Sequence, residues 1–406
     1  MKKVLQIALG IIAAVGGFVD IGELVFNTQA GAEFEYALLW TVPVGVLGIT
    51  VFAEMTGRVA TIAKRPVFGV VRERSGFTAG LLTLVASQLV NLLTLAAEIG
   101  GVAIVLQLLF DITGSLAALV ALVGLVAAVL LLPFGAIERI FGYAGLGLVV
   151  YVFATLDLQP DWHAIGEGFV PHVEHSTLYF YFVVGVIGAA LVPYEVYFYS
   201  SGAIEDGWGP SDLIVNKGNA ILGFGLGGIL SIALICVSAQ VFAPVSVQPD
   251  SLGTAALGAE QAYGETGLLL ALLGMLFAIG GAAIEVSMSG AYNLAQFAGW
   301  EWGKYQGIRV APRFTLAWMG MFVAAVTILA TGIDPVEITE YAVVFSVVAL
   351  PLTYFPVLLV ARDRTFMGEH TNGWLSNILG WAYFAVILVI ALSAIPLLLA
   401  TNGGSG

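Results

Sequence analysis

Apolar runs of membrane-spanning length recur along the whole chain. A helix needs roughly 20 apolar residues to cross the hydrocarbon core of a bilayer. Only 10% of the 406 residues are charged and 59% are hydrophobic, too apolar a balance for a soluble fold. We therefore predict an all-α integral membrane protein that forms a single domain over residues 1–406. Its eleven transmembrane helices are expected at 4–27, 36–57, 76–109, 115–133, 141–156, 177–200, 217–243, 265–292, 314–332, 337–361 and 374–400.

The basic residues indicate how such a chain is oriented. Short cytoplasmic loops of membrane proteins hold an excess of Lys and Arg. With eleven spans, all 14 Lys and Arg residues fall on the side of the N-terminus, and the opposite loops are acidic. We predict a multi-pass protein of the cell membrane with a cytoplasmic N-terminus and an extracellular C-terminus. An acidic outer face would concentrate cations.

Two spans contain residues that interrupt a helix. Residues 16–23 hold three glycines and two carboxylates in the first span. In the sixth span, Pro193 lacks the N–H that would bond the carbonyl of Ala189. The interruptions are five spans apart, as in transporters built from two inverted repeats. We expect discontinuous helices 1 and 6, repeats at 1–156 and 177–361, and an additional helix at 374–400.

Three carboxylates accompany these interruptions: Asp20, Glu23 and Glu195. An ionised carboxylate inside a membrane costs roughly 3 kcal/mol or more. Every Lys and Arg is assigned to a cytoplasmic loop or a helix end, so none is expected to pair with these carboxylates. A bound cation or bound protons remain as compensation. With the carbonyls of Ala189 and Gly17, the carboxylates would form an all-oxygen shell suited to Mg²⁺, Mn²⁺ or Ca²⁺. The alternative is that they are protonated and hydrogen-bonded between helices.

Other polar residues give weaker signals. Glu98 and Glu285 are further membrane carboxylates that could relay protons or simply pack, and packing is favoured for Glu285. Solvated loops explain the histidines, at 163, 172, 175 and 370, better than a metal trap does. Cys236 is the one cysteine, which excludes a disulfide within the chain. The sequence has no phosphate loop, nucleotide motif, nucleophile elbow or basic aromatic patch, so we expect no enzyme activity, no cofactor and no nucleic-acid partner.

Taken with their flanks, the two interruptions resemble the NRAMP family of divalent-metal transporters. Residues 17–23, followed by 28–32, are similar to the family's Asp-Pro-Gly-Asn motif and its downstream Gln-Ala-Gly. Residues 192–195 lie where the family has Met-Pro-His-Asn, and further similarity runs through Glu98, 101–104 and 361–368. The resemblance implies a LeuT-type fold of eleven or twelve spans, with Asp20 as the metal-binding aspartate and Ala189 as a carbonyl ligand.

Departures from the family pattern bear on the ion and on its coupling. Val192 replaces the methionine that marks soft metals, and Glu23 replaces an asparagine. The histidine linked to proton movement is Tyr194, and an expected aspartate is Leu95. Ile21 occupies the position of the motif proline, so only the glycines would interrupt the first helix. This pattern is similar to the NRAMP-related magnesium transporters, a branch that lacks the methionine and is thought not to couple transport to protons.

The sequence therefore predicts a secondary transporter of hard divalent cations, Mg²⁺ or Mn²⁺, that works by alternating access without proton coupling. The metal is the substrate, Val192 and Tyr194 line its path, and Glu98 lies in a second layer or accepts protons. Two rival functions are a proton-coupled Mn²⁺ or Fe²⁺ transporter and a LeuT-fold transporter of an organic cation or amino acid. A membrane protein that senses metal without moving it is a third.

Overall fold

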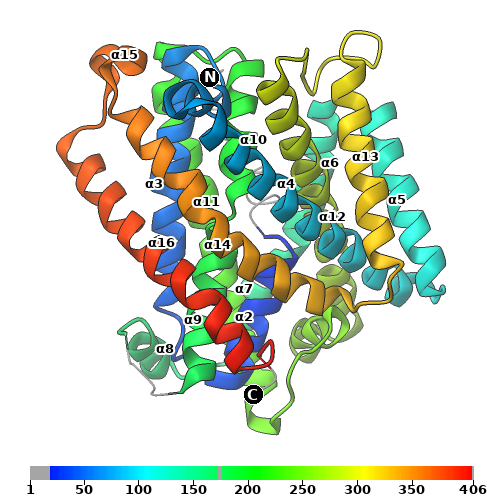
Figure 1. Ribbon diagram of the computed structural model, residues 1–406. Coiled ribbons are helices and arrows are strands. Elements are labelled where there is room, and N and C mark those ends of the chain that lie inside the picture. The colour runs from blue at the N-terminus through cyan, green and yellow to red at the C-terminus, as the bar shows by residue number, and fades with distance from the viewer. Residues whose placement is uncertain (1–18, 172–175, 405–406) are drawn as a thin grey trace.

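The computed structural model describes residues 19–171 and 176–404. Several sequence-based expectations fall outside these residues: the first part of span 1, the candidate ligand Gly17, Lys2, Lys3, His172 and His175. All regular elements of the described part are helical, as Figure 1 shows. The α-helices are α2 (Ile21–Phe34), α3 (Thr41–Ala63), α4 (Val67–Phe110), α5 (Gly114–Leu131), α6 (Phe134–Gly145), α7 (Val150–Asp157), α8 (Trp162–Gly168), α9 (Thr177–Ala190), α10 (Pro193–Glu205), α11 (Leu213–Val241), α12 (Leu252–Ala298), α13 (Pro312–Leu329), α14 (Pro335–Ala361), α15 (Arg364–Met367) and α16 (Trp374–Ala400).

Ten helical stretches of the described residues are long and apolar enough to cross a membrane. Three of these stretches are composite. Helices α6 and α7 are joined by a 3₁₀ turn at Leu146–Val149, α9 and α10 form the sixth span together, and α11 is flanked by 3₁₀ turns at Pro210–Asp212 and Ala243–Val245. Helix α2 continues the first predicted span, whose beginning lies outside the described residues. The all-α membrane architecture is thus confirmed, with a helix count consistent with eleven.

Two glycines mark where long helices change direction. Gly76 in α4 has φ 84° and Gly264 in α12 has φ 59°, both in the region that favours glycine. Each divides a short leading helix from a long span, close to the predicted span starts at 76 and 265. The two breaks precede the third and eighth spans at opposite ends of the bundle. This correspondence is what a five-plus-five inverted repeat requires, although the repeat boundaries at 156 and 177 remain predictions.

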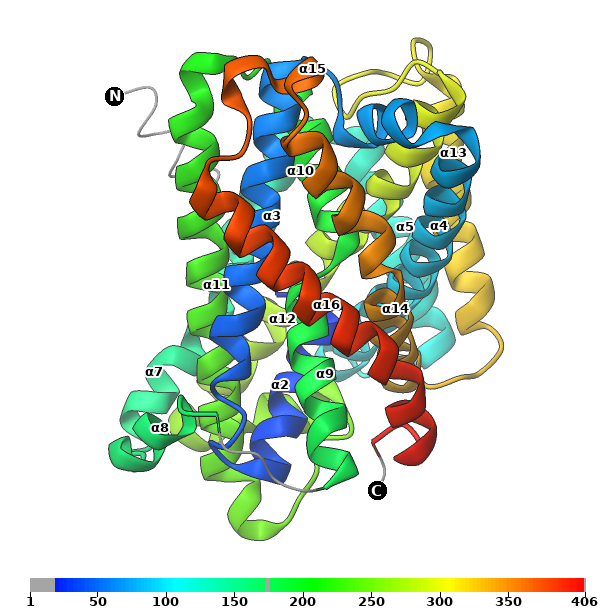
Figure 2. The ribbon, with the colours of Figure 1, turned by 60° about the vertical axis from the view of Figure 1, so that its left-hand side comes forward.

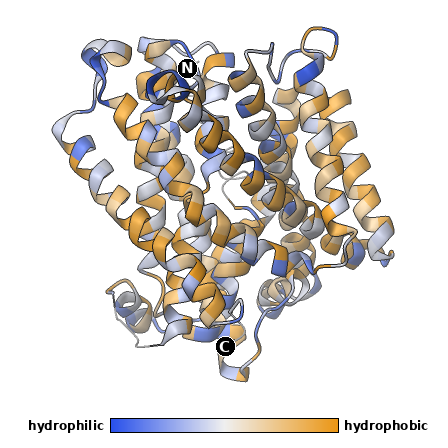
Figure 3. Cartoon of the chain, in the orientation of Figure 1, coloured by the Kyte–Doolittle hydropathy of each residue, from blue (hydrophilic) through white to orange (hydrophobic). Residues whose placement is uncertain are grey.

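The loops form two chemically different ends. We call the end that carries Arg58, Lys64, Arg72, Arg74 and Lys304 the basic end, and the end that carries α8 and the loops before α3, α12 and α14 the acidic end. Figures 1 and 2 show α15 at the basic end and α8, with the C-terminal residues, at the opposite end. In Figure 3 apolar residues dominate the lengths of the helices between the ends. This distribution suits a protein embedded in lipid.

Helices differ in how deeply they lie in the bundle. Helix α4 packs on α12 and α14, and α11 packs on α2, so these elements enclose the interruptions. By contrast, only 17% of the apolar window of α5 and of α16 is buried, which leaves both helices to face lipid. The candidate site therefore lies at the centre of the protein rather than on its periphery.

Candidate metal centre

The sixth-span interruption lies within the described residues, whereas the first is described only from residue 19 onward. Helix α9 ends at Ala190 and α10 begins at Pro193, and the two residues between them leave helical geometry. Asp20 precedes α2 in an extended conformation, with φ −91° and ψ −178°. Its Oδ1 accepts a hydrogen bond of 2.9 Å from the backbone N–H of Glu23 and so caps the helix. The discontinuity of the sixth span is confirmed, and α2 begins at the membrane aspartate.

Proline explains the open backbone at the sixth-span break. Because Pro193 has no N–H, the carbonyl of Ala189 loses its usual helical partner. The neighbouring carbonyl of Leu191 accepts a hydrogen bond of 3.3 Å from the hydroxyl of Tyr354 on α14. A carbonyl released in this way can serve as an oxygen ligand.

The two breaks meet through Asp20 and Tyr194. The Tyr194 hydroxyl donates a 3.1 Å hydrogen bond to Oδ2 of Asp20, and both side chains are buried. Gly22 lets the start of α2 pack closely against α14, since a Cβ at Gly22 would lie 3.0 Å from Cγ2 of Val343 and 3.1 Å from Oδ1 of Asp20. Ala189 lies against the same glycine. The aspartate and the opened end of α9 therefore lie side by side.

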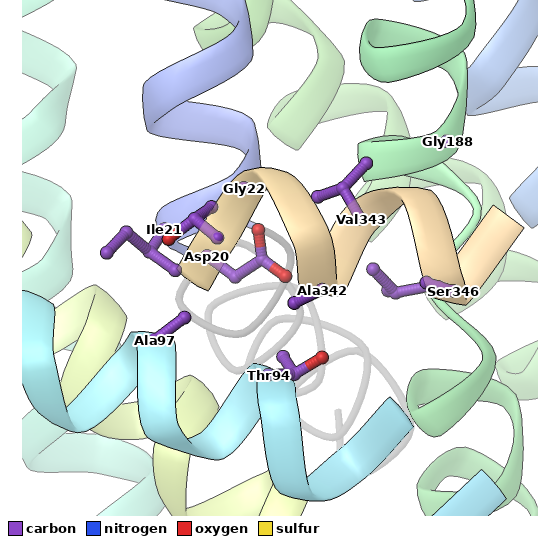
Figure 4. A pocket seen from close by; sticks show the side chains of 11 residues that line it. Asp20, Ile21, Gly22, Thr94, Ala97, Gly188, Ala342, Val343 and Ser346 are labelled. Carbon is purple, nitrogen blue, oxygen red and sulfur yellow. The ribbon is translucent and has the colours of Figure 1, made fainter. Parts of the chain in front are cut away.

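A small cavity adjoins the Asp20 carboxylate. Its volume is about 10 Å³, on the order of the space for one water molecule, and Figure 4 shows α2, α4, α9 and α14 around it. Its polar groups are the Asp20 carboxylate and three hydroxyls, and the Ser346 hydroxyl has no hydrogen-bond partner. The complete lining is Asp20, Ile21, Gly22, Thr94, Ala97, Gly188, Val192, Thr339, Ala342, Val343 and Ser346.

Glu23 and Glu98 lie next to the start of α2 but outside the cavity lining. Oε1 of Glu98 accepts a 3.3 Å hydrogen bond from the N–H of Ile21, while its Oε2 has no partner. Glu23 points toward α11, where its Oε2 accepts a 2.5 Å hydrogen bond from the Ser231 hydroxyl and another from Asn27. Glu98 thus supports the backbone beside Asp20, and Glu23 joins α2 to α11.

Glu195 lies beyond Tyr194 and is hydrogen-bonded to Glu285 of α12. The three predicted carboxylate ligands consequently have three different partners. Across residues 19–171 and 176–404, no group of three or more His, Cys, Asp or Glu side chains is placed to hold a metal ion. Asp20 and Val192 line the cavity, and Tyr194 borders it. Because the predicted ligands do not converge on one point, the full ligand set, including Ala189 and Glu195, stays a prediction.

Sequence reasoning missed or undervalued three residues. Glu285 was assigned to packing, yet it contacts a candidate ligand. Asn27 and Ser231 were not singled out, although Asn27 follows Glu23 by four residues and so shares its helix face. Ser231 is distant in sequence and carries no comparable signal.

The charged loop residues are arranged largely as expected. None of the ion pairs found in the described part joins a Lys or Arg to Asp20, Glu23 or Glu195. Lys304 departs from the picture of a solvated loop lysine, since its side chain is only 3% exposed and lies 3.0 Å from Glu138. The His163 side chain is 82% exposed, which agrees with a solvated loop.

Comparison with known proteins places this geometry in context. The family model described as natural resistance-associated macrophage protein-like (Nramp) matches residues 10–396. A protein of Deinococcus radiodurans named divalent metal cation transporter MntH is 25% identical over 400 residues, which cover 94% of this chain and 87% of that protein. The protein of that name from Staphylococcus aureus strain Mu50 is 24% identical over 411 residues, with 94% and 88% covered.

Solved structures agree on the fold. The manganese transporter of Eremococcus coleocola, in complex with an aromatic bis-isothiourea compound, superposes with a TM-score of 0.81 at 18% identity, covering 98% of this chain and 92% of that one. Mhp1, a nucleobase-cation-symport-1 family transporter, gives a TM-score of 0.55 at 14% identity, with 97% and 93% covered. The chain has the helical transporter fold that these proteins share.

Proposed function

The chain belongs to the Nramp family, and on that premise we propose that it is a secondary transporter of hard divalent metal cations, Mg²⁺ or Mn²⁺. The observation that carries the proposal is the buried Asp20 carboxylate, which lines a cavity at the junction of two helix breaks. Its relatives from Staphylococcus aureus and Deinococcus radiodurans are named divalent metal cation transporters. Those names identify transporters rather than enzymes, which agrees with the absence of catalytic motifs from the sequence.

The chemistry of the cavity supports a hard ion. Its polar lining is made of oxygen: the Asp20 carboxylate and the hydroxyls of Thr94, Thr339 and Ser346. Val192 contributes no sulfur, and hard divalent ions prefer oxygen ligands. Because Mg²⁺ gives up water reluctantly, we propose that the cavity widens during transport and that the ion keeps several waters there, held by Asp20, the carbonyl of Ala189 and the hydroxyls. Glu195, Glu23 and the carbonyl of Gly17 complete the proposed ligand set as the site rearranges during transport.

Transport without proton coupling is the second part of the proposal. Tyr194 occupies the motif histidine position and donates its hydroxyl proton to Asp20 as a hydrogen bond. A phenol titrates near pH 10, too high to exchange protons readily at neutral pH. The nearby Glu98 is tied to the backbone of Ile21. These contacts favour a positioning role for both residues over a proton relay.

The cavity lining also bears on the rival substrate. An organic cation or amino acid would call for aromatic walls, yet no aromatic side chain lines this cavity in the described part of the protein. Tyr194 borders it only through the hydroxyl that meets Asp20. The small volume and the oxygen lining therefore favour a metal ion over an organic substrate.

Orientation follows from the charge distribution. We propose that the basic end is cytoplasmic and the acidic end extracellular, in the cell membrane, because Lys and Arg are retained in cytoplasmic loops. The substrate would then approach from the acidic end and leave at the basic end, with the bilayer as the protein's surroundings.

Uptake into sealed liposomes tests the function. Purified protein should admit Mg²⁺ and Mn²⁺ while a trapped pH indicator stays constant, and Asp20→Ala should abolish uptake. Val192→Met should improve Cd²⁺ relative to Mg²⁺, because a thioether favours the softer ion. Acidification that accompanies metal entry would restore the proton-coupled alternative. Unchanged Mg²⁺ uptake by Asp20→Ala would exclude the proposed site, and absence of any uptake would leave a sensor.

A further inference from the structure

Glu285 is a membrane carboxylate that the central cavity does not use. It lies on α12 with Ser289 and Tyr292, spaced by four and three residues on one helix face. The Ser289 hydroxyl donates a 2.9 Å hydrogen bond to the carbonyl of Tyr194, and the Tyr292 hydroxyl bonds Glu205 near the end of α10. Together these contacts fix α12 along α10, and they place Glu285 against Glu195.

One carboxyl oxygen of Glu195 has no hydrogen-bond partner within the described part of the protein. Its side chain is only 6% exposed, and its Oε2 has no hydrogen-bond partner. A buried carboxylate oxygen without a donor is costly, so a second ligand is expected beside it. No described Lys or Arg pairs with Glu195 or Glu285. Lys304, which acts on Glu285 electrostatically, is itself held by Glu138 and Asp206.

The Glu195–Glu285 pair lies on the side of the cavity that faces the basic end. Tyr194 separates the two: its hydroxyl meets Asp20 on the cavity side, and Glu195 is the next residue along α10. From there α10 runs to the basic end, where Asp206 and Lys304 lie. An ion released from Asp20 toward the basic end would meet the Glu195–Glu285 pair next.

We propose that Glu195 and Glu285 form a second cation site, which receives the divalent ion as it leaves the central cavity. The proton that the two hydrogen-bonded carboxyl groups share passes to water as the ion binds and returns when the ion leaves, so that no net proton is transported. The inference rests on the proposed function, extends it by one binding site and assigns Glu195 to this second site rather than to the central one. Two carboxylates and water supply the oxygen ligands that Mg²⁺ and Mn²⁺ prefer. Glu138 adds negative potential nearby, whereas Lys304 and the hydroxyl of Tyr194 complete the polar surroundings.

Mn²⁺ uptake by Glu285→Gln in liposomes tests the second site. Glutamine keeps the size and hydrogen-bonding capacity of glutamate but removes its charge. We expect the maximal rate to fall about tenfold, with the half-saturating Mn²⁺ concentration changed by less than about twofold because the Asp20 cavity is intact. Glu265→Gln, at an exposed position of the same helix, is the matched control and should behave as the parent protein.

Two further variants separate charge from shape. Glu285→Asp retains a carboxylate and should recover most of the lost rate, and Glu195→Gln combined with Glu285→Gln should be little slower than Glu285→Gln alone if the two residues form one site. A Glu285→Gln rate equal to that of Glu265→Gln would overturn the proposal, as would an Asp variant as slow as the Gln variant. The proposed function fails separately, if the parent protein shows no uptake or Asp20→Ala retains it.

Discussion

The basic and acidic ends of the molecule are held together by different interactions. At the basic end, ion pairs and charged hydrogen bonds join segments that are far apart in sequence, such as Lys304 with Glu138 and Arg74 with Asp363. At the acidic end, the long-range side-chain contacts are hydrogen bonds without Lys or Arg, such as Trp40 with Tyr179. The difference follows from the placement of every described Lys and Arg at the basic end.

This contrast concerns how firmly each end is held. Only the basic end pairs opposite charges, whereas carboxylates of the acidic end such as Glu33 and Asp157 accept hydrogen bonds from neutral side chains, so we expect the basic end to be held more strongly. The cavity beside Asp20 is lined by Gly188 of α9 and Thr339 of α14, and both helices begin at the acidic end. An ion that leaves toward the basic end must pass these charged contacts.

Among the substitutions that remove contacts at either end, Lys304→Met is expected to cause the largest loss of folding stability. Lys304 lies 3.0 Å from Glu138 and 3.7 Å from Asp206. Burial alone would lower the pKa of Lys304, but the two carboxylates raise it above its usual value, so the pair persists at neutral pH. Loss of the amine should cost about 2–3 kcal/mol, the low end for a broken buried pair, because the carboxylates are partly exposed.

Thermal unfolding of the purified protein measures this cost, with exposed Lys217→Met as the control. Since the pKa of Lys304 is raised on folding, its contribution is complete below the unfolded-state pKa and is lost as pH rises through the folded-state value. Equal stabilities of the two variants at neutral pH would contradict a buried fastening at Lys304.

A smaller loss is expected from Arg58→Met. The Arg58 guanidinium donates 2.7 Å hydrogen bonds to the carbonyl of His370 and to Oδ1 of Asn372, and it pairs with Glu54. Its removal should cost about 2 kcal/mol and free the segment between α14 and α16. Limited proteolysis should then cut within residues 362–373 faster than in Arg65→Met, which breaks only an exposed pair with Glu73. Similar cleavage rates would show that Arg58 does not fasten this segment.

Removing a side-chain hydrogen bond at the acidic end should lower the folding stability less. Trp40→Phe removes a 3.0 Å hydrogen bond from Nε1 to the Tyr179 hydroxyl, and we expect a loss of about 1 kcal/mol. Tyr179→Phe removes the other partner, and the double variant should be no less stable than the worse single one if the bond is the whole effect. A loss that exceeds that of Lys304→Met would reverse the proposed ranking of the two ends.

The smallest change concerns Asp363, at the exposed surface of the basic end. Hydrogen bonds from Thr365, followed by Arg74, hold the pKa of Asp363 below its usual value. Its contribution is therefore present above the unfolded-state pKa and is lost as pH falls through the folded-state value. Asp363→Asn should lower the melting temperature slightly at neutral pH and leave it unchanged at strongly acidic pH. The same small loss at both pH values would rule out the ionised carboxylate as its source.

Much of the fold could be predicted because lipid imposes simple rules on sequence. Apolar runs predict the spans, and Pro193 predicts the break between α9 and α10. The positions of Gly76 and Gly264 agree with predicted span starts. The short helices that lead into α4 and α12 carry no comparable apolar signal and were not expected. The burial of Lys304 was not expected either, because its partners are Glu138 of α6 and Asp206 at the end of α10, both distant in sequence.

The candidate site was harder to predict because side-chain direction depends on partners distant in sequence. Asp20, which the sequence predicts as a metal ligand, lines a central cavity, and its role as a ligand stays a prediction. Glu23 was expected beside it, but Ser231 and Asn27 draw its carboxylate toward α11. Glu285 was undervalued because its contact with Glu195 spans two helices that no local pattern connects.

The position of a bound ion tests the account most directly. Crystals grown with Mn²⁺ would reveal it by anomalous scattering, and Asp20→Ala crystals provide the control. We predict a peak in the cavity between the Asp20 carboxylate and the carbonyl of Ala189, absent from the Asp20→Ala protein. A cavity without a peak at saturating Mn²⁺, or a peak that persists without the Asp20 carboxylate, would contradict the assignment of this junction as the transport site.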